Sequence, residues 1–381
     1  MRDMVEIGMG RTARRTYELG EINIVPSRRT RSSQDVSTGW QLDAYRFDIP
    51  VIAHPTDALV SPDFAIELGR LGGLGVLNGE GLIGRHADVE GCIARVVEAA
   101  DKQVDPAVPV RMLQQLHAAP LDLDLLGEAV ARVREAGVTT AVRVSPQNAQ
   151  ALTPTLVAAG IDLLVIQGTI ISAERVTQGR DGGEPLNLKT FISELDVPVV
   201  AGGVADHRTA LHLMRTGAAG VIVGYGSTAG VTTSDEVLGI SVPMATAIAD
   251  AAAARREYLD ETGGRYVHVL ADGDIHTSGE LAKAIACGAD AVMLGTPLAT
   301  AAEALGGGWY WPSAAAHPSL PRGALLQVAL GERPPLARVL NGPSDDPFGS
   351  LNVVGGLRRS MAKAGYCDLK EFQKVELTVG S

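Results

Sequence analysis

The chain has 381 residues, enough for one large domain or two modest ones, and its 46% hydrophobic and 20% charged residues are typical of a globular protein. Its net charge of −11 argues against a nucleic-acid-binding protein, whose binding surface is basic. No apolar stretch approaches a membrane span, and the N-terminus lacks the apolar core of a signal peptide, so we expect a cytoplasmic protein without nucleic acid or membrane partners.

The cysteines give a second indication of the compartment. Cys92, Cys287 and Cys367 are far apart and odd in number. They therefore predict neither a disulfide framework nor a zinc site, and they favour a reducing compartment.

Short apolar, β-branched runs recur along the chain and are typical of buried parallel strands. Eight such runs lie at residues 50–53, 74–77, 139–144, 161–166, 197–201, 220–223, 266–271 and 291–294. Most are followed by a helical pattern, as where Ser61 and Pro62 predict a helix that ends at Gly72. Eight βα units over about 250 residues predict a single (β/α)8 TIM barrel rather than two doubly wound domains.

The domain organisation follows from these runs. We expect an N-terminal extension at 1–48, the barrel at 49–330 and a C-terminal segment at 331–381. The long interval 79–138 between the second and third strands leaves room for a decoration with helices at 89–99 and 125–136, but not for another domain.

The C-terminal segment is predicted to contain little regular structure. Several prolines predict a loop at 331–349, and short helices are expected at 357–364 and 368–373.

Two glycine-containing loops near the C-terminus carry the strongest functional signal. Asp272-Gly273-Asp274 follows the seventh strand, and Gly295-Thr296 follows the eighth. The last two units of a (β/α)8 barrel commonly build a phosphate site in this way, because backbone N–H groups at helix N-termini favour an anion. Ordinary βα turns would give the same pattern. Other segments of the chain are therefore needed to distinguish a phosphate site from ordinary turns.

Four further segments make a specific match with a known family. They are 21–31 (Glu-Ile-Asn-Ile-Val-Pro-Ser-Arg-Arg-Thr-Arg), 49–57 (Ile-Pro-Val-Ile-Ala-His-Pro-Thr-Asp), 70–76 (Arg-Leu-Gly-Gly-Leu-Gly-Val) and 354–361 (Val-Gly-Gly-Leu-Arg-Arg-Ser-Met). With the two loops, they resemble the IMP dehydrogenase/GMP reductase family from about residue 18 to 378. The chain resembles in particular the actinobacterial IMP dehydrogenase-related paralogue without CBS domains, because the interval after the second strand is too short to hold that pair of domains.

The resemblance implies that the barrel binds a purine nucleoside monophosphate (IMP, GMP or XMP). Asp272 matches the carboxylate that hydrogen-bonds the ribose hydroxyls, whereas Gly273 and the Gly295-Thr296 turn match the backbone around the phosphate. The predicted nucleotide-binding residues are Asp272, Gly273, Asp274, Gly295, Thr296, Ser227 and Thr228.

Asp274 departs from the family, which has glycine at this position. A carboxylate there repels a phosphate unless it turns away or pairs with a base such as His276 or Arg322.

The resemblance also implies NAD or NADP as the cofactor, a monovalent cation at the Gly224-Tyr225-Gly226 loop, and a homotetramer or octamer. Gln167 stands where the family has an acidic residue that contacts the cofactor ribose, and Gly203 stands where it has asparagine. The predicted cofactor-binding residues are Gln167, Gly168, Gly203, Gly224 and Gly226.

The family's catalytic cysteine is missing. Its thiolate attacks the purine, hydride leaves to the nicotinamide, and the adduct is then hydrolysed. Val231 occupies that position, and the family's Arg-Tyr flap that activates water is shortened. Thr232, Thr233 and His54 are weak candidates for a replacement, and no metal site is predicted.

Three functions therefore stay open at this point. The first is an NAD(P)-dependent oxidoreductase of guanine nucleotide metabolism that works without the covalent cysteine. The second is a non-catalytic purine-nucleotide-binding or regulatory paralogue. The third is a different chemistry on a phosphorylated ligand, since barrels change their reactions through their loops.

Overall fold

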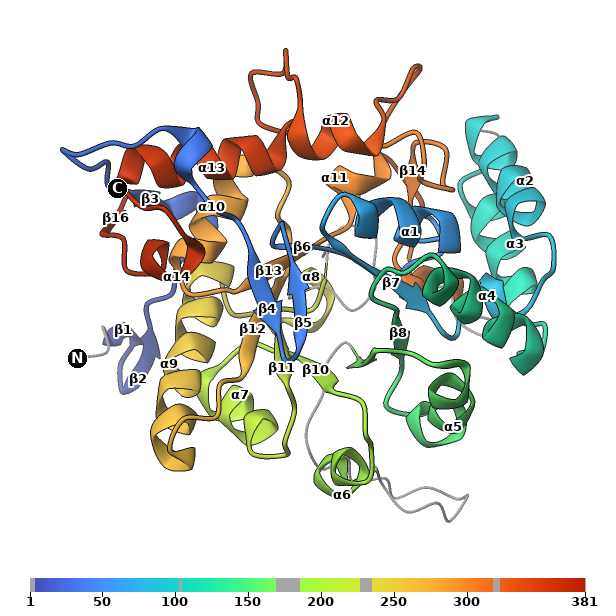
Figure 1. Ribbon diagram of the computed structural model, residues 1–381, viewed down its shortest axis with the longest axis horizontal. Coiled ribbons are helices and arrows are strands. Elements are labelled where there is room, and N and C mark those ends of the chain that lie inside the picture. The colour runs from blue at the N-terminus through green and yellow to red at the C-terminus, as the bar shows by residue number, and fades with distance from the viewer. Residues whose placement is uncertain (1–3, 103–104, 169–185, 227–234, 318–322, 381) are drawn as a thin grey trace.

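The computed structural model describes residues 4–102, 105–168, 186–226, 235–317 and 323–380 (Figure 1). Eight parallel strands form a closed barrel in the order β10-β11-β12-β13-β6-β7-β8-β9, which confirms the predicted fold. The strands are β6 (Val51–Ala53), β7 (Leu74–Asn78), β8 (Ala141–Val144), β9 (Leu163–Gln167), β10 (Val199–Val204), β11 (Gly220–Val223), β12 (His268–Asp272) and β13 (Ala291–Leu294).

The barrel strands were predictable because nearly all of their side chains are buried. Alternate residues, among them Val76, Val165 and Ile222, point into the barrel and fill it. At the N-terminal end of the strands, the β-hairpin of β4 (Trp40–Leu42) and β5 (Tyr45–Phe47) adds Leu42 to the same interior layer. The interior of the barrel is thus a packed core, and the hairpin of the N-terminal extension closes it at the N-terminal end of the strands.

Helices surround the barrel. They are α1 (Pro62–Arg70), α2 (Val89–Asp101), α3 (Ala107–His117), α4 (Leu123–Glu135), α5 (Ala149–Ala159), α6 (Leu188–Ser193), α7 (His207–Met214), α8 (Asp235–Leu238), α9 (Met244–Thr262), α10 (Ser278–Ala286) and α11 (Thr296–Ala299). The predicted start of α1 is confirmed, since the Ser61 hydroxyl accepts a hydrogen bond from the backbone N–H of Phe64 at 3.0 Å.

The remaining elements flank the barrel. They are β1 (Met4–Gly8), β2 (Arg11–Arg14), β3 (Ile22–Ile24), β14 (Trp309–Tyr310), β15 (Leu326–Gln327), α12 (Leu336–Asn341), α13 (Val353–Ala364), α14 (Leu369–Phe372), β16 (Leu377–Val379), and short 3-10 helices at Leu19–Glu21, Ser33–Asp35, Leu82–Gly84 and Ser313–Ala316. Strand β16 pairs with β3, so the C-terminal segment lies against the N-terminal extension.

The predicted loop at 331–349 is wrong in part, because α12 lies within it. The prolines that suggested a loop include Pro335, which directly precedes the helix at its N-cap. Proline is compatible with a helix start because the first N–H groups of a helix have no partner inside it.

A buried carboxylate, Asp290, joins the C-terminal segment to the N-terminal end of the barrel. It accepts hydrogen bonds from Arg255 Nη1 at 2.7 Å and Tyr266 Oη at 2.8 Å, and from the Lys370 ammonium and the Gln373 amide. Burial alone would raise the pKa of Asp290, but the charges of Arg255 and Lys370 outweigh it and hold the pKa at about 2. The carboxylate is therefore charged, although only 2% of the residue is exposed.

The neighbouring His268 should make stability depend on pH. Burial lowers its pKa to about 4, against the opposing charge of Asp290. The unfolded chain then binds more protons between about pH 6.5 and pH 4, so the unfolding free energy should fall by roughly 1–3 kcal/mol as the pH decreases through that range. Urea titrations at several pH values will measure this slope. It should be shallower in His268→Gln and unchanged in the exposed control His212→Gln. An unchanged slope in His268→Gln contradicts the assignment.

Candidate functional site

The mouth of the barrel, where the strands end, contains a buried carboxylate held by two neighbours. Asp272 ends β12 and is 2% exposed. Gln167 ends β9, and its amide Nε2 donates to Asp272 Oδ2 at 2.5 Å. His54 follows β6, and its Nε2 lies 3.4 Å from the same oxygen. Because a carboxylate offers about four acceptor positions, these two contacts leave capacity for the hydroxyl groups of a ligand.

Tyr310 holds the other side of His54. Its hydroxyl lies 3.4 Å from His54 Nδ1, and its side chain is fully buried on β14. Burial, together with the charges of Asp272 and Asp274, raises the pKa of Tyr310, so the hydroxyl remains protonated. Sequence reasoning missed Tyr310, because nothing local links it to a histidine 256 residues away.

The turn after β13 packs directly on this tyrosine. A Cβ atom at Gly295 would lie 2.5 Å from the Tyr310 hydroxyl, which is closer than real Cβ contacts allow. Glycine is therefore required for β14 to cover the turn, whichever ligand the turn binds.

The loop after β11 comes equally close to Asp272. Gly224 has a φ of +102°, and a Cβ atom there would lie 2.0 Å from the backbone oxygen of Asp272. The N–H of Gly226 donates to that oxygen at 3.1 Å. Two of the predicted cofactor-binding glycines thus fix the end of β11 against the end of β12.

The other predicted cofactor-binding glycines connect β9 with β10. The N–H of Gly203 donates to the carbonyl of Gly168 at 3.2 Å, and the N–H of Gly168 donates to that of Gly202 at 3.0 Å. In this arrangement, they offer no side chain to a ligand.

The predicted phosphate loops lie together beside the mouth. His276 Nδ1 is 2.9 Å from Thr296 Oγ1, and this contact joins the turn after β12 to the start of α11. His276 Nε2 lies 3.8 Å from Asp274 Oδ1, so one of the two bases suggested for Asp274 is beside it. Gly273 is packed against Met244, since a Cβ atom there would lie 2.9 Å from its sulfur.

An ion pair between Arg143 and Glu80, which the sequence did not predict, contacts the backbone of Gln167. Arg143, on β8, donates through Nη2 to the backbone oxygen of Gln167 at 2.8 Å and through Nη1 to Glu80 Oε2 at 3.1 Å. Glu80 also accepts from the hydroxyl and the N–H of Ser145. Burial lowers the pKa of Arg143 against the charge of Glu80. The only signal in the sequence was one cation within an apolar strand, Ala-Val-Arg-Val.

Five of the predicted site residues lie outside the described residues, as does Arg322. They are Ser227, Thr228, Val231, Thr232 and Thr233.

The cysteines lie away from the mouth. Cys92 is buried on α2, and Cys287 follows α10, where burial raises its pKa to about 12. Cys367 lies between α13 and α14. Within the described ranges, no three histidine, cysteine or acidic side chains are grouped as a metal site. No helix in the described part of the chain is long and apolar enough to cross a membrane.

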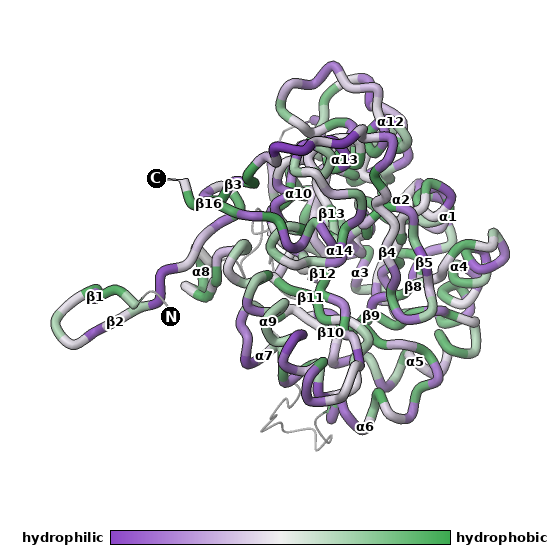
Figure 2. Tube along the Cα trace, turned by 60° about the vertical axis from the view of Figure 1, so that its left-hand side comes forward, coloured by the Kyte–Doolittle hydropathy of each residue, from purple (hydrophilic) through white to green (hydrophobic). Residues whose placement is uncertain are grey.

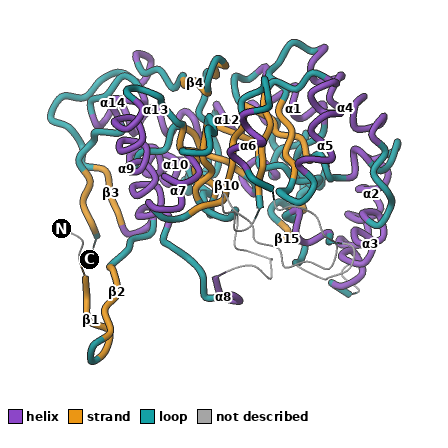
Figure 3. Tube along the Cα trace, turned by 90° about the horizontal axis from the view of Figure 1, so that it is seen from below, coloured by secondary structure: helices purple, strands orange, loops and turns teal. Residues whose placement is uncertain are grey.

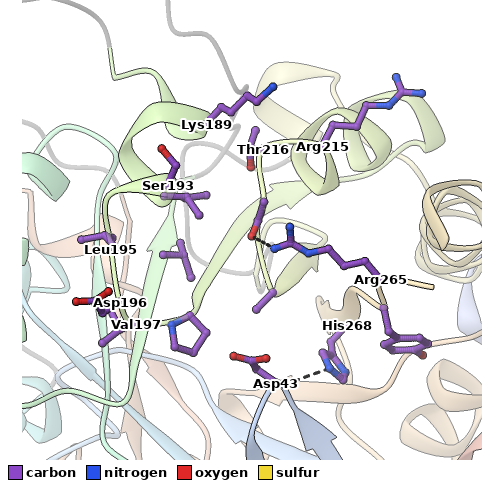
Figure 4. Close-up of a pocket in the computed structure, with 16 residues that line it drawn as sticks. Asp43, Lys189, Ser193, Leu195, Asp196, Val197, Arg215, Thr216, Arg265 and His268 are labelled. Carbon is purple, nitrogen blue, oxygen red and sulfur yellow. Dashed lines mark hydrogen bonds between the residues drawn. The ribbon is translucent and has the colours of Figure 1, made fainter. Parts of the chain in front are cut away.

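A cavity of about 660 Å³ opens at the opposite end of the barrel (Figure 4). Lys189, Arg215 and Arg265 lie around it, together with Asp43 from the β4–β5 turn. We do not assign the nucleotide to this cavity, because (β/α)8 barrels bind their ligands at the C-terminal ends of the strands, where Asp272 lies.

Comparisons with known proteins agree on one family. A family model described as the IMP dehydrogenase/GMP reductase domain matches residues 16–314. A Mycolicibacterium smegmatis protein named an uncharacterized oxidoreductase is 88% identical over 378 residues, which cover 99% of this chain and 100% of that protein. The inosine-5'-monophosphate dehydrogenase of Pasteurella multocida is 38% identical over 169 residues, 44% of this chain and 31% of that protein.

A solved structure is similar over almost the whole chain. The crystal structure of the IMP dehydrogenase/GMP reductase-like protein from Corynebacterium glutamicum matches with a TM-score of 0.92 and 58% identity. The match covers 99% of this chain and 98% of that one.

Proposed function

Because the chain belongs to the IMP dehydrogenase/GMP reductase family, we propose that the mouth of its barrel binds a purine nucleoside monophosphate. The observation that carries the proposal is the buried carboxylate of Asp272, which Gln167 holds at the end of β12. In the family, the matching carboxylate hydrogen-bonds the ribose hydroxyls. IMP, GMP and XMP share that ribose and its phosphate.

The neighbouring turns supply the phosphate end of the proposed site. The N–H groups of the Gly295-Thr296 turn are the proposed donors to an anion there. His276 lies beside this turn, with its Nδ1 2.9 Å from the Thr296 hydroxyl. His276 Nε2 lies 3.8 Å from Asp274 Oδ1, so a protonated His276 would offset the carboxylate that otherwise repels the phosphate. A tetramer or octamer of the family's kind belongs to the same proposal.

The first candidate activity is that of an NAD(P)-dependent oxidoreductase in guanine nucleotide metabolism, as membership of the family suggests. The described residues do not fit the cofactor in the way that the resemblance implies. The amide of Gln167, at the ribose-contacting position, is bonded inward to Asp272, and Gly203 has no side chain to offer. We therefore assign no chemical step to the cofactor.

A second candidate, a non-catalytic nucleotide-binding paralogue, is favoured by the same observation. The amide of Gln167 donates to Asp272 and not toward a cofactor, and Val231 stands at the family's cysteine position. Both substitutions remove catalytic or cofactor contacts of the family, whereas Asp272 and the Gly295-Thr296 turn keep the residue types that the proposed nucleotide contacts require.

Thermal unfolding with IMP, GMP, XMP and AMP tests the binding proposal. A ligand that binds only the folded state at 100 times its Kd adds about 2.7 kcal/mol and should raise the melting temperature by several degrees. The absence of a rise with every one of the four nucleotides would overturn nucleotide binding.

The chemistry has a separate prediction. We expect wild-type protein incubated with IMP and NAD to form no covalent nucleotide adduct, because the side chain of Val231 is not a nucleophile. Intact-mass spectrometry will detect the adduct, and NADH absorbance will report turnover. Val231→Cys is the gain-of-function variant, and Val231→Ala is its matched control.

The outcomes separate the two candidates. NADH formation by the wild type supports the oxidoreductase and overturns the non-catalytic candidate. NADH formation by Val231→Cys alone supports the non-catalytic candidate. An adduct on the wild type contradicts the loss of the covalent route.

A further inference from the structure

The interior of the barrel changes from apolar to polar near its mouth. Val165 on β9 and Leu270 on β12 point into the barrel, and Gln167 and Asp272 follow two residues later, on the same face of each strand. The side chains that line the interior beneath them are apolar, and Figure 2 shows β11 and β12 mainly in the colour of hydrophobic residues. A further hydrogen-bond donor to this polar level therefore comes from beside it or from the mouth above it.

The polar side chains meet across the barrel. Strands β9 and β12 are separated by β10 and β11, yet the side chains of Gln167 and Asp272 are hydrogen-bonded. His54 reaches the same carboxylate from the end of β6, with β13 between the two strands. The three side chains therefore point toward the barrel axis. Figure 3 shows the barrel strands at the centre of the molecule, between the surrounding helices.

One acceptor at this level has no partner. The amide of Gln167 turns its NH2 group toward Asp272, because the oxygens of a carboxylate accept hydrogen bonds and an amide oxygen cannot donate one. The orientation of the amide is thereby fixed, and its oxygen Oε1 faces elsewhere. Among the described residues, no donor reaches this oxygen, although Gln167 is only 7% exposed. A buried acceptor without a donor is unfavourable, so a ligand that supplies the donor gains affinity.

The position of this acceptor matches a pair of neighbouring hydroxyl groups. Gln167 Nε2 is 2.5 Å from Asp272 Oδ2, and Oε1 is bonded to the same carbon as Nε2. The amide oxygen and the carboxylate therefore lie within about 5 Å of each other. Two acceptors at that spacing suit two donors on adjacent carbons of one ligand, and the 2′- and 3′-hydroxyls of a ribose are such donors. An anion fits poorly there, because both groups are acceptors.

We propose that Gln167 recognises the ribose of the bound nucleotide. Its Oε1 accepts a hydrogen bond from one ribose hydroxyl, while its NH2 group holds Asp272, which accepts from the other hydroxyl. The role of Gln167 rests on the proposed function, since it requires a nucleotide at the mouth. It adds a specificity for ribonucleotides, because a nucleotide that lacks either hydroxyl leaves one buried acceptor unpaired.

The contacts of Gln167 differ from those that the resemblance implies. The family has an acidic residue at this position, which contacts the ribose of the cofactor. A carboxylate there would repel Asp272, whereas the amide donates to it. Arg143 holds the backbone oxygen of Gln167 at 2.8 Å, which fixes the strand end that carries the amide. Because Asp272 in turn orients the amide, loss of Asp272 disturbs both ribose contacts.

Titration with nucleotides that lack one hydroxyl tests this role. GMP, 2′-deoxy-GMP and 3′-deoxy-GMP are titrated in turn into the full-length protein by isothermal titration calorimetry, or the IMP series is used if IMP gives the larger thermal shift. No dinucleotide is present, so the ribose of a cofactor does not contribute. The wild type is expected to bind each deoxynucleotide at least about 10-fold more weakly than the ribonucleotide. Equal affinity for the ribonucleotide and either deoxynucleotide overturns the proposal.

Gln167→Met removes the amide oxygen and keeps the length of the side chain. In this variant, one of the two deoxynucleotides should bind as tightly as the ribonucleotide, while the preference over the other deoxynucleotide remains. Loss of both preferences together, or of neither, assigns Gln167 to the support of Asp272 alone and overturns the proposal. Gln41→Met makes the same change at an exposed glutamine on β4, at the opposite end of the barrel, and should bind all three nucleotides like the wild type.

Failure of this role is distinguishable from failure of the proposed function. Tight binding of ribonucleotides and deoxynucleotides alike overturns only the role of Gln167. Absence of binding by any of the ribonucleotides overturns the proposed function and the role of Gln167 together. Circular dichroism without ligand will measure whether Gln167→Met folds, and the wild-type titrations decide the proposal even if it does not.

Discussion

Replacing Asp290 by alanine is expected to lower the unfolding free energy by about 3–5 kcal/mol, the usual cost of removing one partner of a buried ion pair. The variant leaves Arg255 charged, 7% exposed and without its partner carboxylate. It also removes the acceptor for Tyr266 Oη and for the Lys370 ammonium. Urea denaturation followed by circular dichroism will measure the change.

The matched control for Asp290→Ala is Glu371→Ala, which removes a carboxylate from the same C-terminal segment. Glu371 pairs with Lys374 at 2.7 Å, and both side chains are more than half exposed. Exposed pairs contribute about 0–1 kcal/mol, so Glu371→Ala should change the unfolding free energy by less than about 1 kcal/mol. If Asp290→Ala also lowered the unfolding free energy by less than about 1 kcal/mol, the structural role of the buried carboxylate would be contradicted.

Replacing Asp272 by alanine is expected to weaken nucleotide binding by at least about 100-fold. Hydrogen bonds to a charged group contribute about 1.5–3 kcal/mol each, and the proposed contact to the ribose involves two hydroxyl groups. Isothermal titration calorimetry with the nucleotide that gives the largest thermal shift will measure the loss.

Asp274→Asn is the matched control for Asp272→Ala. It removes a carboxylate beside the proposed phosphate position, so affinity should stay the same or rise. Melting of both variants without nucleotide separates lost binding from lost folding, because Asp272→Ala also removes the acceptor for Gln167. Undiminished affinity in Asp272→Ala would contradict the assignment of the ribose contact.

The barrel could be predicted from the sequence because its strands are buried on both faces, which makes them continuous apolar runs such as Gly220–Val223. Helices without such signals were missed. Helix α5 contains Pro154, a residue that usually argues against a helix interior, and α9 starts after Pro243 without a side-chain cap. The hairpin of β1 and β2 was missed because these strands bury almost nothing.

The proposed site was only partly predictable. Asp272 and the Gly295 turn follow predicted strands directly, so their places at the mouth follow from the fold. Tyr310 and Glu80 reach the site through contacts between residues far apart in the sequence, which no local pattern encodes.

The pairing of β16 with β3 has a consequence for how the protein is made on the ribosome. Lys370 and strand β16 emerge only after all eight barrel strands have been synthesised, yet they complete the ion pairs of Asp290 and the partner of β3. A nascent barrel therefore carries an incompletely paired Asp290 and an unpaired strand β3 until residues 370–379 leave the exit tunnel, and chaperones would bind it during this interval.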